Sequence, residues 1–414
     1  MLKNSSYFHY DPCEGSSELL IIFSGAGAKG FNLFKLLKDY PINKLFIRDA
    51  TRSWYQNPIL EHWQDMDGMI AQIKIISENF EGSKITCMGG SMGGYAALVT
   101  AAKLNAERAL VFSPQTIIDP RLPNQPSPDI KLLYPNAFDV LSKSPETKVK
   151  FISGTEDFAD IYNISSAYQY RRFEVEFIYM APHNLMNYLF QRNMLLEVID
   201  AYLQNRPAYI LNPVINFLDY PNLLRTCCEF VRALYFDDFD SVIAHSMLNQ
   251  LQQASPSWPG VYHHRGKLYA KSSHHFEAVI QFEKAASLNA FMDETIFHDL
   301  GKSAMQVGDY KMAEYAFENA NKFLSKPSPT YLSKLGAAMM LQERYDEAIN
   351  LQRQACELNN KFGPAYYQLG LLFSKTKRYS ESIEMFEKAI AVDFKHPNLK
   401  KNLATATNLL NNSF

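Results

Sequence analysis

The second half of this chain repeats itself at a nearly constant interval. Glycine recurs at four positions that are 35, 35 and 34 residues apart: Gly266, Gly301, Gly336 and Gly370. A small residue stands twelve positions after each of them: Ala278, Ala313, Ala348 and Ser382. A unit this short cannot bury an apolar face by itself, so successive copies must stack around a continuous core. The second half is therefore expected to form a stacked array.

The small residues indicate that each copy is a pair of helices. An alanine stands nineteen positions after each glycine, and small side chains let two helices approach closely: Ala285, Ala320, Ala355 and Ala389. Sixteen positions after three of the glycines stands a phenylalanine, which is predicted to fill the gap between neighbouring repeats: Phe282, Phe317 and Phe386. The pattern resembles the tetratricopeptide repeat, a helix–turn–helix unit of about 34 residues. The resemblance implies an all-α solenoid.

Four such repeats are predicted at 259–394, followed by a capping helix at 395–414. Residues 208–258 are predicted to be a helical linker with a degenerate repeat, in which Ala244, Leu248 and Pro256 keep the register. Arrays of this kind present a concave surface to peptides or proteins. We therefore expect a protein partner or self-association through the array.

The first half contains a different signal, the run Gly89-Gly90-Ser91-Met92-Gly93, which reads G-x-S-x-G. Residues 84–88 before it have the composition of a buried strand, and residues 95–102 after it that of a small-residue helix. In such a strand–turn–helix the turn is too tight for bulky neighbours, and the serine is exposed beside the N-terminus of the helix. Ser91 is therefore a candidate nucleophile.

A serine hydroxyl needs a general base, and the base needs an orienting group. Asp157 follows a predicted strand at 148–153, and His183 follows another at 175–180. Asp157 is predicted to orient His183, which would take the proton from Ser91. Glu156 and Asp160 are nearby rivals for the acid role, and Asp157 could instead be a helix cap.

These residues resemble the small form of the α/β-hydrolase superfamily over residues 15–205. The resemblance implies a catalytic domain at 1–207 with a mainly parallel sheet and helices on both faces, and an order of Ser, Asp, His along the chain. It also implies an oxyanion hole made by the backbone N–H groups of Met92 and Ala26. Many members have His-Gly at the start of the loop that contains the second donor, where this chain has Ser24-Gly25.

Three further segments of the first half bear on the site. Residues 31–40 are predicted to form a helix. Arg48, Trp54 and Tyr55 lie in or beside a loop after a predicted strand at 44–48, where open α/β sheets bind ligands, and are candidate substrate contacts. Arg52 lies in the same loop. The proline-rich residues 115–147 are a long irregular excursion that either shapes the pocket or is a plain surface loop.

The composition bears on the partners and the cellular location of the protein. The net charge of −2 favours neither nucleic acid nor an anionic membrane as a partner. The five cysteines have no metal-ligand spacing, and neither do the pairs His263-His264 and His274-His275, so no metal is expected. The first residues lack the apolar core of a signal peptide, and no stretch approaches about 20 apolar residues. We expect a cytoplasmic protein.

The leading functional hypothesis is an esterase or deacylase that cleaves an ester or thioester through an acyl-serine intermediate, without a cofactor. The alternative is an acetyl-CoA-dependent O-acetyltransferase that acts on a capsular or surface polysaccharide, because the same triad can pass its acyl group to a sugar hydroxyl. A third hypothesis of another class is a repeat scaffold with an inactive hydrolase-like domain.

Overall fold

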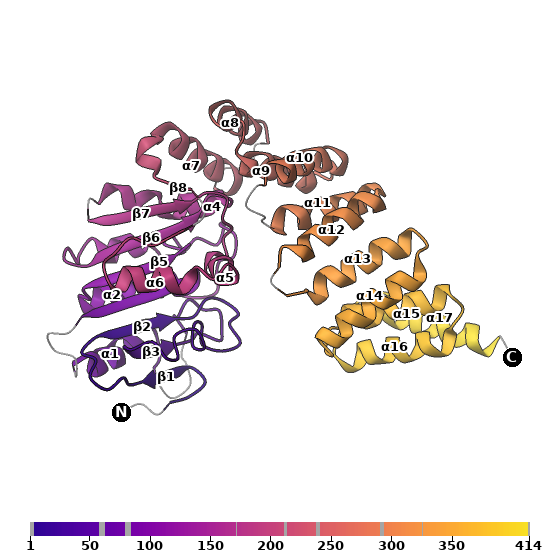
Figure 1. The fold of residues 1–414 in the computed structure, drawn as a ribbon, viewed down its shortest axis with the longest axis horizontal. Coiled ribbons are helices and arrows are strands. Elements are labelled where there is room, and N and C mark those ends of the chain that lie inside the picture. Colours follow the sequence, from indigo (N-terminus) through magenta and orange to yellow (C-terminus); the bar gives the residue numbers. More distant parts are fainter. Residues whose placement is uncertain are drawn as a thin grey trace. The chain divides into compact units, whose positions relative to one another are not determined.

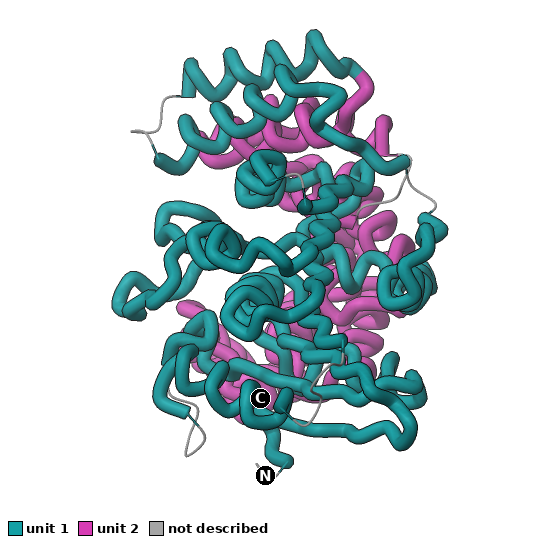
Figure 2. The backbone as a smooth tube through the Cα atoms, turned by 90° about the vertical axis from the view of Figure 1, so that its left-hand side faces the viewer, with its two compact units in different colours: residues 1–256 teal, residues 257–414 magenta. Residues whose placement is uncertain are grey.

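The computed structural model describes residues 4–57, 63–78, 84–170, 172–210, 213–236, 241–289, 294–324 and 326–412. Figure 1 shows their helices and strands. The chain divides into two compact units, residues 1–256 and 257–414, which Figure 2 distinguishes by colour. Each unit is described by itself.

In the described residues, the first unit has one sheet in the order β1-β3-β2-β4-β5-β6-β7-β8. Its strands are β1 (Phe8–Asp11), β2 (Leu19–Phe23), β3 (Asn43–Ile47), β4 (Ile85–Gly90), β5 (Arg108–Phe112), β6 (Lys148–Gly154), β7 (Phe173–Ile178) and β8 (Val214–Ile215). Neighbouring strands from β3 to β7 run parallel, whereas β1 and β8 pair antiparallel at the two edges. The carboxyl ends of the parallel strands therefore meet at one edge of the sheet.

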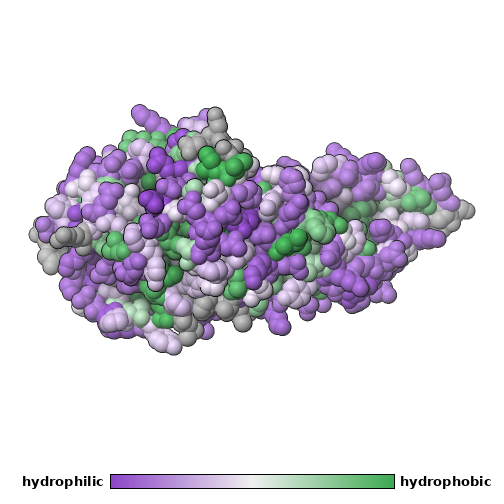
Figure 3. Space-filling model, turned by 90° about the horizontal axis from the view of Figure 1, so that it is seen from above, coloured by the Kyte–Doolittle hydropathy of each residue, from purple (hydrophilic) through white to green (hydrophobic). Residues whose placement is uncertain are grey.

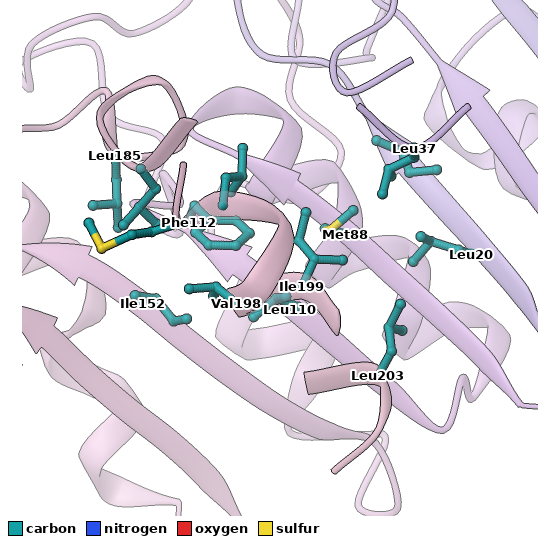
Figure 4. Close-up of a cluster of buried hydrophobic side chains, with 14 of the residues drawn as sticks. Leu20, Leu37, Met88, Leu110, Phe112, Ile152, Leu185, Val198, Ile199 and Leu203 are labelled. Carbon is teal, nitrogen blue, oxygen red and sulfur yellow. The ribbon is translucent and has the colours of Figure 1, made fainter. Parts of the chain in front are cut away.

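Helices cover both faces of this sheet. Leu20 and Ile22 of β2 and Met88 of β4 face one side, where they pack with α5 (Leu185–Gln191) and α6 (Leu195–Leu203) (Figure 4). The intervening residues Ile21 and Cys87 are fully buried on the other side, where α2 (Met92–Leu104) packs against β2, β4 and β5 and α1 (Met66–Ser77) packs against α2. Two-sided burial explains why these strands read as continuous apolar runs.

The predicted helix at 31–40 is wrong. The segment forms a series of turns, and Leu33 has φ of +62°, a left-handed backbone conformation that a right-handed helix does not contain. The apolar residues of the segment still pack against the core cluster on the α5–α6 side. Their spacing therefore reflected burial rather than helix formation.

The first unit extends beyond the predicted boundary at 207. After a short 3-10 turn (Phe217–Asp219) come α7 (Pro221–Tyr235) and α8 (Ser241–Ala254). Phe230 of α7 packs edge-on against Phe158 of α4 (Phe158–Ser165), with ring centroids 5.6 Å apart. Ala244 and Leu248 of α8 are fully buried. The segment predicted as a linker therefore packs with the sheet unit as far as Pro256.

The second unit consists of paired helices. In the described residues the first helices of the four pairs are α9 (Pro259–Lys271), α11 (Glu294–Val307), α13 (Pro329–Leu341) and α15 (Gly363–Lys375). The second helices are α10 (His275–Leu288), α12 (Tyr310–Lys322), α14 (Tyr345–Leu358) and α16 (Tyr379–Ala391), and α17 (Leu399–Asn411) follows the last pair. The pairs coincide with the four predicted repeats.

The repeated glycine and phenylalanine meet inside each pair. A Cβ atom on Gly266 would lie 2.5 Å from the ring of Phe282, and one on Gly301 would lie 2.5 Å from the ring of Phe317. The aromatic ring thus packs on the first helix of its own repeat, and not only against the next repeat as predicted. A larger side chain at the glycine would separate the two helices, because their packing leaves no room for it.

Exposed apolar residues occur singly or in small groups. They include Val242 and Ile243 on α8, and Phe276 and Ile280 on α10. On the face that Figure 3 shows, hydrophobic residues form small separate patches among hydrophilic ones, a pattern that needs no functional explanation. Across the described ranges, no helix combines the length and the apolar character needed to span a bilayer.

Candidate active site

Ser91 stands at a sharp turn between β4 and α2. Its φ is +52°, a strained value for a residue with a side chain, and its N–H donates to the carbonyl oxygen of Phe112 at 2.9 Å. The chain on either side has no room for side chains. A Cβ on Gly89 would lie 2.3 Å from the carbonyl oxygen of Gly93, and one on Gly93 would lie 2.4 Å from that of Phe23. The glycines of the motif are therefore required by close backbone approach.

Two hydrogen bonds connect Ser91 to an imidazole and a carboxylate. The Oγ atom of Ser91 lies 3.1 Å from Nε2 of His183. On the other side of the ring, Nδ1 of His183 lies 2.7 Å from Oδ1 of Asp160. Asp160 is almost fully buried, with 2% of its surface exposed. The hydroxyl, the imidazole and the carboxylate thus follow one another in the order of contacts by which a base and an orienting acid activate a serine.

The acid in contact with His183 is Asp160, not the predicted Asp157. Asp157 is the N-cap of α4, where its side chain accepts a hydrogen bond of 2.9 Å from the N–H of Ala159. Asp160 lies one turn further along, inside α4, and is turned toward the sheet, where Ser153 Oγ is 3.4 Å from its Oδ2. The helix begins one residue after Asp157, so the aspartate nearer to the end of β6 is used as its cap.

The environment of His183 favours its protonated form. Burial lowers the pKa of His183, but the charge and hydrogen bond of Asp160 oppose it, and the charges of Asp157 and Glu156 add to them. The sum raises the pKa of His183 to about 9. A protonated Nε2 donates to Ser91 and has no lone pair to take its proton, so the base function requires the neutral ring.

The pKa of His183 predicts the pH dependence of any reaction that begins at Ser91. At pH 7 only about one ring in a hundred would be neutral with a pKa of about 9. We expect kcat/KM for a neutral ester to rise with pH, nearly tenfold per pH unit below pH 8, to be half-maximal near pH 9 and to level off above it. Initial rates between pH 6 and 10 measure this. A profile that is already flat at pH 7 would show that His183 titrates lower.

The two predicted oxyanion donors lie beside Ser91. Met92 is the first residue of α2, and Ala26 lies in the loop after β2, the strand adjacent to β4. In the described part of the chain, neither backbone N–H donates a hydrogen bond to another group. The N-terminus of α2 adds a partial positive charge at the same place. Both N–H groups are thus available to an anionic oxygen.

A pocket of about 690 Å³ opens at Ser91 and His183. Ala26 and its neighbours form one wall; they belong to residues 24–30, the glycine-rich loop after β2. The proline-rich excursion forms another through Asn124, Gln125 and Ile130. The excursion therefore forms part of the pocket wall. Sequence had marked the excursion without singling out these side chains, because nothing local distinguishes them from other loop residues.

Of the three predicted substrate contacts, one lines the pocket and two do not. Trp54 lines the pocket, and its Nε1 donates to Oε1 of Gln115 at 3.0 Å. Tyr55 is fully buried and donates to the carbonyl oxygen of Ser24 at 2.8 Å. Arg48 donates to the carbonyl oxygen of Ala28 at 3.2 Å. Neither Tyr55 nor Arg48 is among the described pocket residues, whereas Arg52 is.

Three potential metal ligands also meet at this site. Asp157, Asp160 and His183 place one ligand atom each within 4.8 Å of one another. The cap of α4 and the bond to His183 already engage the two carboxylates, so the hydrogen bonds explain the cluster without an ion.

Among the histidines of the repeats, His263 is fully buried, and its Nε2 lies 3.0 Å from Oδ2 of Asp299 in the following pair of helices.

Comparisons with known proteins concern the repeats. Models of the tetratricopeptide repeat family match residues 330–361 and 363–396. The small glutamine-rich tetratricopeptide repeat-containing protein 2 of Mycosarcoma maydis is 36% identical over 113 residues, which are 27% of this chain and 32% of that protein. The chain thus spans about a third of the length of that relative. The C-terminal part of the chain carries tetratricopeptide repeats.

Three solved structures are similar to part of the chain. YrrB, described as a TPR protein with an unusual peptide-binding site, is 20% identical, with a TM-score of 0.37 over 46% of this chain and 90% of its own. MamA from Desulfovibrio magneticus RS-1 is 18% identical, with a TM-score of 0.34 over 36% and 84%. The Sgt2 TPR domain from Aspergillus fumigatus is 22% identical, with a TM-score of 0.28 over 29% and 80%.

Proposed function

We propose that the first unit is a serine esterase or deacylase of the kind found in the α/β-hydrolase superfamily, which cleaves an ester or thioester through an acyl-serine intermediate. The observation that supports this most directly is the pair of contacts from Ser91 Oγ to His183 Nε2, 3.1 Å, and from His183 Nδ1 to Asp160 Oδ1, 2.7 Å. A serine in an ordinary glycine turn has no reason to lie against a histidine whose other ring nitrogen contacts a buried carboxylate.

The first half-reaction forms the acyl-enzyme. Ser91 Oγ attacks the carbonyl carbon while its proton passes to Nε2 of His183, and the carbonyl oxygen becomes an oxyanion. The N–H groups of Met92 and Ala26 would donate to that oxyanion. Asp160 holds the imidazolium through Nδ1–H. His183 then protonates the departing alcohol or thiol, which leaves the acyl group on Ser91.

The second half-reaction returns the free enzyme. Water gives a proton to Nε2 of His183 and attacks the acyl carbon, and Ser91 Oγ leaves with the proton that His183 returns. The products are the carboxylic acid and the original serine. The pocket is large enough to admit water or a larger acceptor beside the acyl group.

Labelling with a fluorophosphonate tests the nucleophile. Such probes phosphonylate a serine only where a base and an oxyanion hole activate it. We expect the full-length chain to be labelled stoichiometrically at Ser91, and Ser91→Ala to show no labelling. Mass spectrometry of the labelled peptide identifies the site.

Ser127→Ala is the matched control, because Ser127 lines the same pocket and its Oγ lies 3.3 Å from Oδ2 of Asp129, away from an imidazole. It should label like the wild type. A folded wild type that is not labelled at pH 10, where a ring with a pKa of about 9 is largely neutral, would leave the scaffold hypothesis in place.

A second candidate function is favoured by the polar lining of the pocket. Asn32, Asn124 and Gln125 place amide groups around the site, and such groups suit a hydroxylated acceptor. An O-acetyltransferase that moves an acetyl group from acetyl-CoA to a polysaccharide hydroxyl would use the same triad. Incubation with acetyl-CoA and candidate glycans separates the two, since a transferase acetylates the glycan faster than it releases acetate.

The repeats add a protein-binding array to this unit. We infer that the array recruits the partner or the substrate-bearing assembly on which the first unit acts. The five cysteines are all free thiols, which is compatible with the cytoplasmic location that the sequence suggests.

A further inference from the structure

Arg52 is the feature of the active-site pocket that the acyl-transfer chemistry does not use. Apart from His183, it is the only ionisable side chain among the described residues that line the pocket, and none of those residues is Asp or Glu. Arg52 is exposed, and the described chain offers it no acidic partner. A permanently charged guanidinium in a pocket without acidic side chains attracts anions.

The loop that presents Arg52 is held in an uncommon conformation. Arg52, Trp54 and Tyr55 all have positive φ, at +56°, +56° and +63°. Residues with side chains rarely adopt this conformation, and three of them within four positions persist only where the surroundings enforce it. Strained backbone of this kind is concentrated at binding and catalytic sites, so the loop is a candidate for a functional role.

Asp49 enforces the conformation. Its carboxylate is fully buried and accepts hydrogen bonds from the N–H groups of Thr51, Ser53 and Tyr55 at 2.7, 2.8 and 2.9 Å. The hydroxyl groups of Thr51 and Ser53 donate to it as well, at 2.6 and 3.0 Å. These bonds involve the residues on both sides of Arg52 and leave its side chain directed elsewhere.

The guanidinium of Arg52 lies against the glycine-rich loop. A Cβ on Gly27 would be 2.8 Å from Nη2 of Arg52, and Gly27 itself has φ of +75°. Gly27 adjoins Ala26, the predicted oxyanion donor. Because residue 27 has no side chain, the guanidinium of Arg52 has room to lie against this wall of the pocket. The scissile carbonyl would bind at the same wall.

We propose that Arg52 is a specificity-determining residue that binds an anionic group of the substrate, a carboxylate or a phosphate, next to the reacting ester or thioester. The inference rests on the proposed function of Ser91. A planar guanidinium pairs with either oxyanion through two parallel hydrogen bonds. Arg52 takes no part in bond making. It selects acidic acyl compounds over neutral ones of the same length.

The test compares neutral and anionic substrates in two pairs. One pair is S-acetyl-4′-phosphopantetheine and S-acetylpantetheine, which differ only in a phosphate on the leaving group. The other is mono-4-nitrophenyl adipate and its methyl ester, which differ in a carboxylate on the acyl group. The variants are Arg52→Met and Lys29→Met. Lys29 is an exposed cation of the glycine-rich loop that does not line the pocket, so both variants change the net charge equally.

In Arg52→Met we expect kcat/KM for the anionic member of at least one pair to fall about 10- to 100-fold, while its neutral partner changes less than about threefold. The pair that responds identifies phosphate or carboxylate as the group recognised. Lys29→Met should leave both ratios unchanged. Equal losses for charged and neutral substrates, or the same loss in Lys29→Met, would overturn the role of Arg52.

Fluorophosphonate labelling separates this failure from failure of the proposed function. If Arg52→Met is labelled at Ser91 like the wild type but both anionic-to-neutral ratios are unchanged, Ser91 remains the nucleophile and only the anion site is refuted. If the wild type is not labelled, the acyl-enzyme itself is refuted.

Discussion

Asparagine in place of Asp160 is expected to lower kcat for ester hydrolysis by about 10³- to 10⁴-fold. The amide retains the shape of the carboxylate, but it removes the charge that stabilises the imidazolium of His183. Its NH₂ group can also donate to Nδ1, which leaves the ring proton on Nε2, facing Ser91. In that tautomer the ring cannot accept the serine proton. Steady-state kinetics with 4-nitrophenyl acetate measure the loss.

Asp157→Asn is the matched control for this substitution. It removes the same charge three residues away, and asparagine caps a helix about as well as aspartate, so α4 should keep its start. We expect kcat to change less than about tenfold. The rise of activity should move to lower pH, because the charge of Asp157 helps to raise the pKa of His183.

The reverse outcome would be informative. If Asp157→Asn lost activity and Asp160→Asn did not, the loop before α4 would rearrange during the reaction, and the original sequence prediction of Asp157 as the orienting acid would stand. Circular dichroism of both variants excludes unfolding as the cause.

A methyl group at Gly154 is expected to destabilise the first unit by about 3 kcal/mol or more. Gly154 ends β6, and a Cβ there would lie 1.7 Å from the carbonyl oxygen of Ala181 and 2.4 Å from its carbonyl carbon. That backbone leads into His183. Relief of the overlap must therefore separate the strand before Asp160 from the loop of His183, and activity should fall together with stability.

Urea unfolding followed by tryptophan fluorescence measures the effect. Trp54 and Trp63 lie in the first unit, and Trp258 lies just beyond its end, so the signal reports mainly on that unit. Gly30→Ala is the control, because nothing lies within 4 Å of a Cβ at that position. Equal unfolding midpoints for Gly154→Ala and Gly30→Ala would mean that the two loops can move apart at no cost.

Features that depend on contiguous residues could be predicted well from the sequence. The turn at Ser91 needs only a strand, small residues and a helix in succession, and all of them are adjacent along the chain. The repeats are visible for the same reason, because Gly266 and Phe282 belong to one hairpin that recurs with a fixed period. The position of His183 followed from its place after a strand.

Features that depend on the direction of a side chain could not be predicted in this way. Asp157 and Asp160 are three residues apart, and only the residue at which α4 begins decides which of them caps the helix and which meets the imidazole. Arg48 and Arg52 likewise both follow the end of β3. The hydrogen bonds of Asp49 direct the loop so that Arg52 reaches the pocket and Arg48 does not.

The sequence by itself determined the strand–turn–helix around Ser91, the neighbourhoods of the acid and the base, and the stacked array that follows. These features depend on a repeat period or on the local backbone conformation, and both are set by residues close together in the chain. Only the tertiary structure decided that Asp160 orients His183, that Arg52 enters the pocket and that 31–40 forms turns. Those outcomes depend on contacts between segments far apart in the chain, where a shift of one residue in a helix start redirects every side chain that follows.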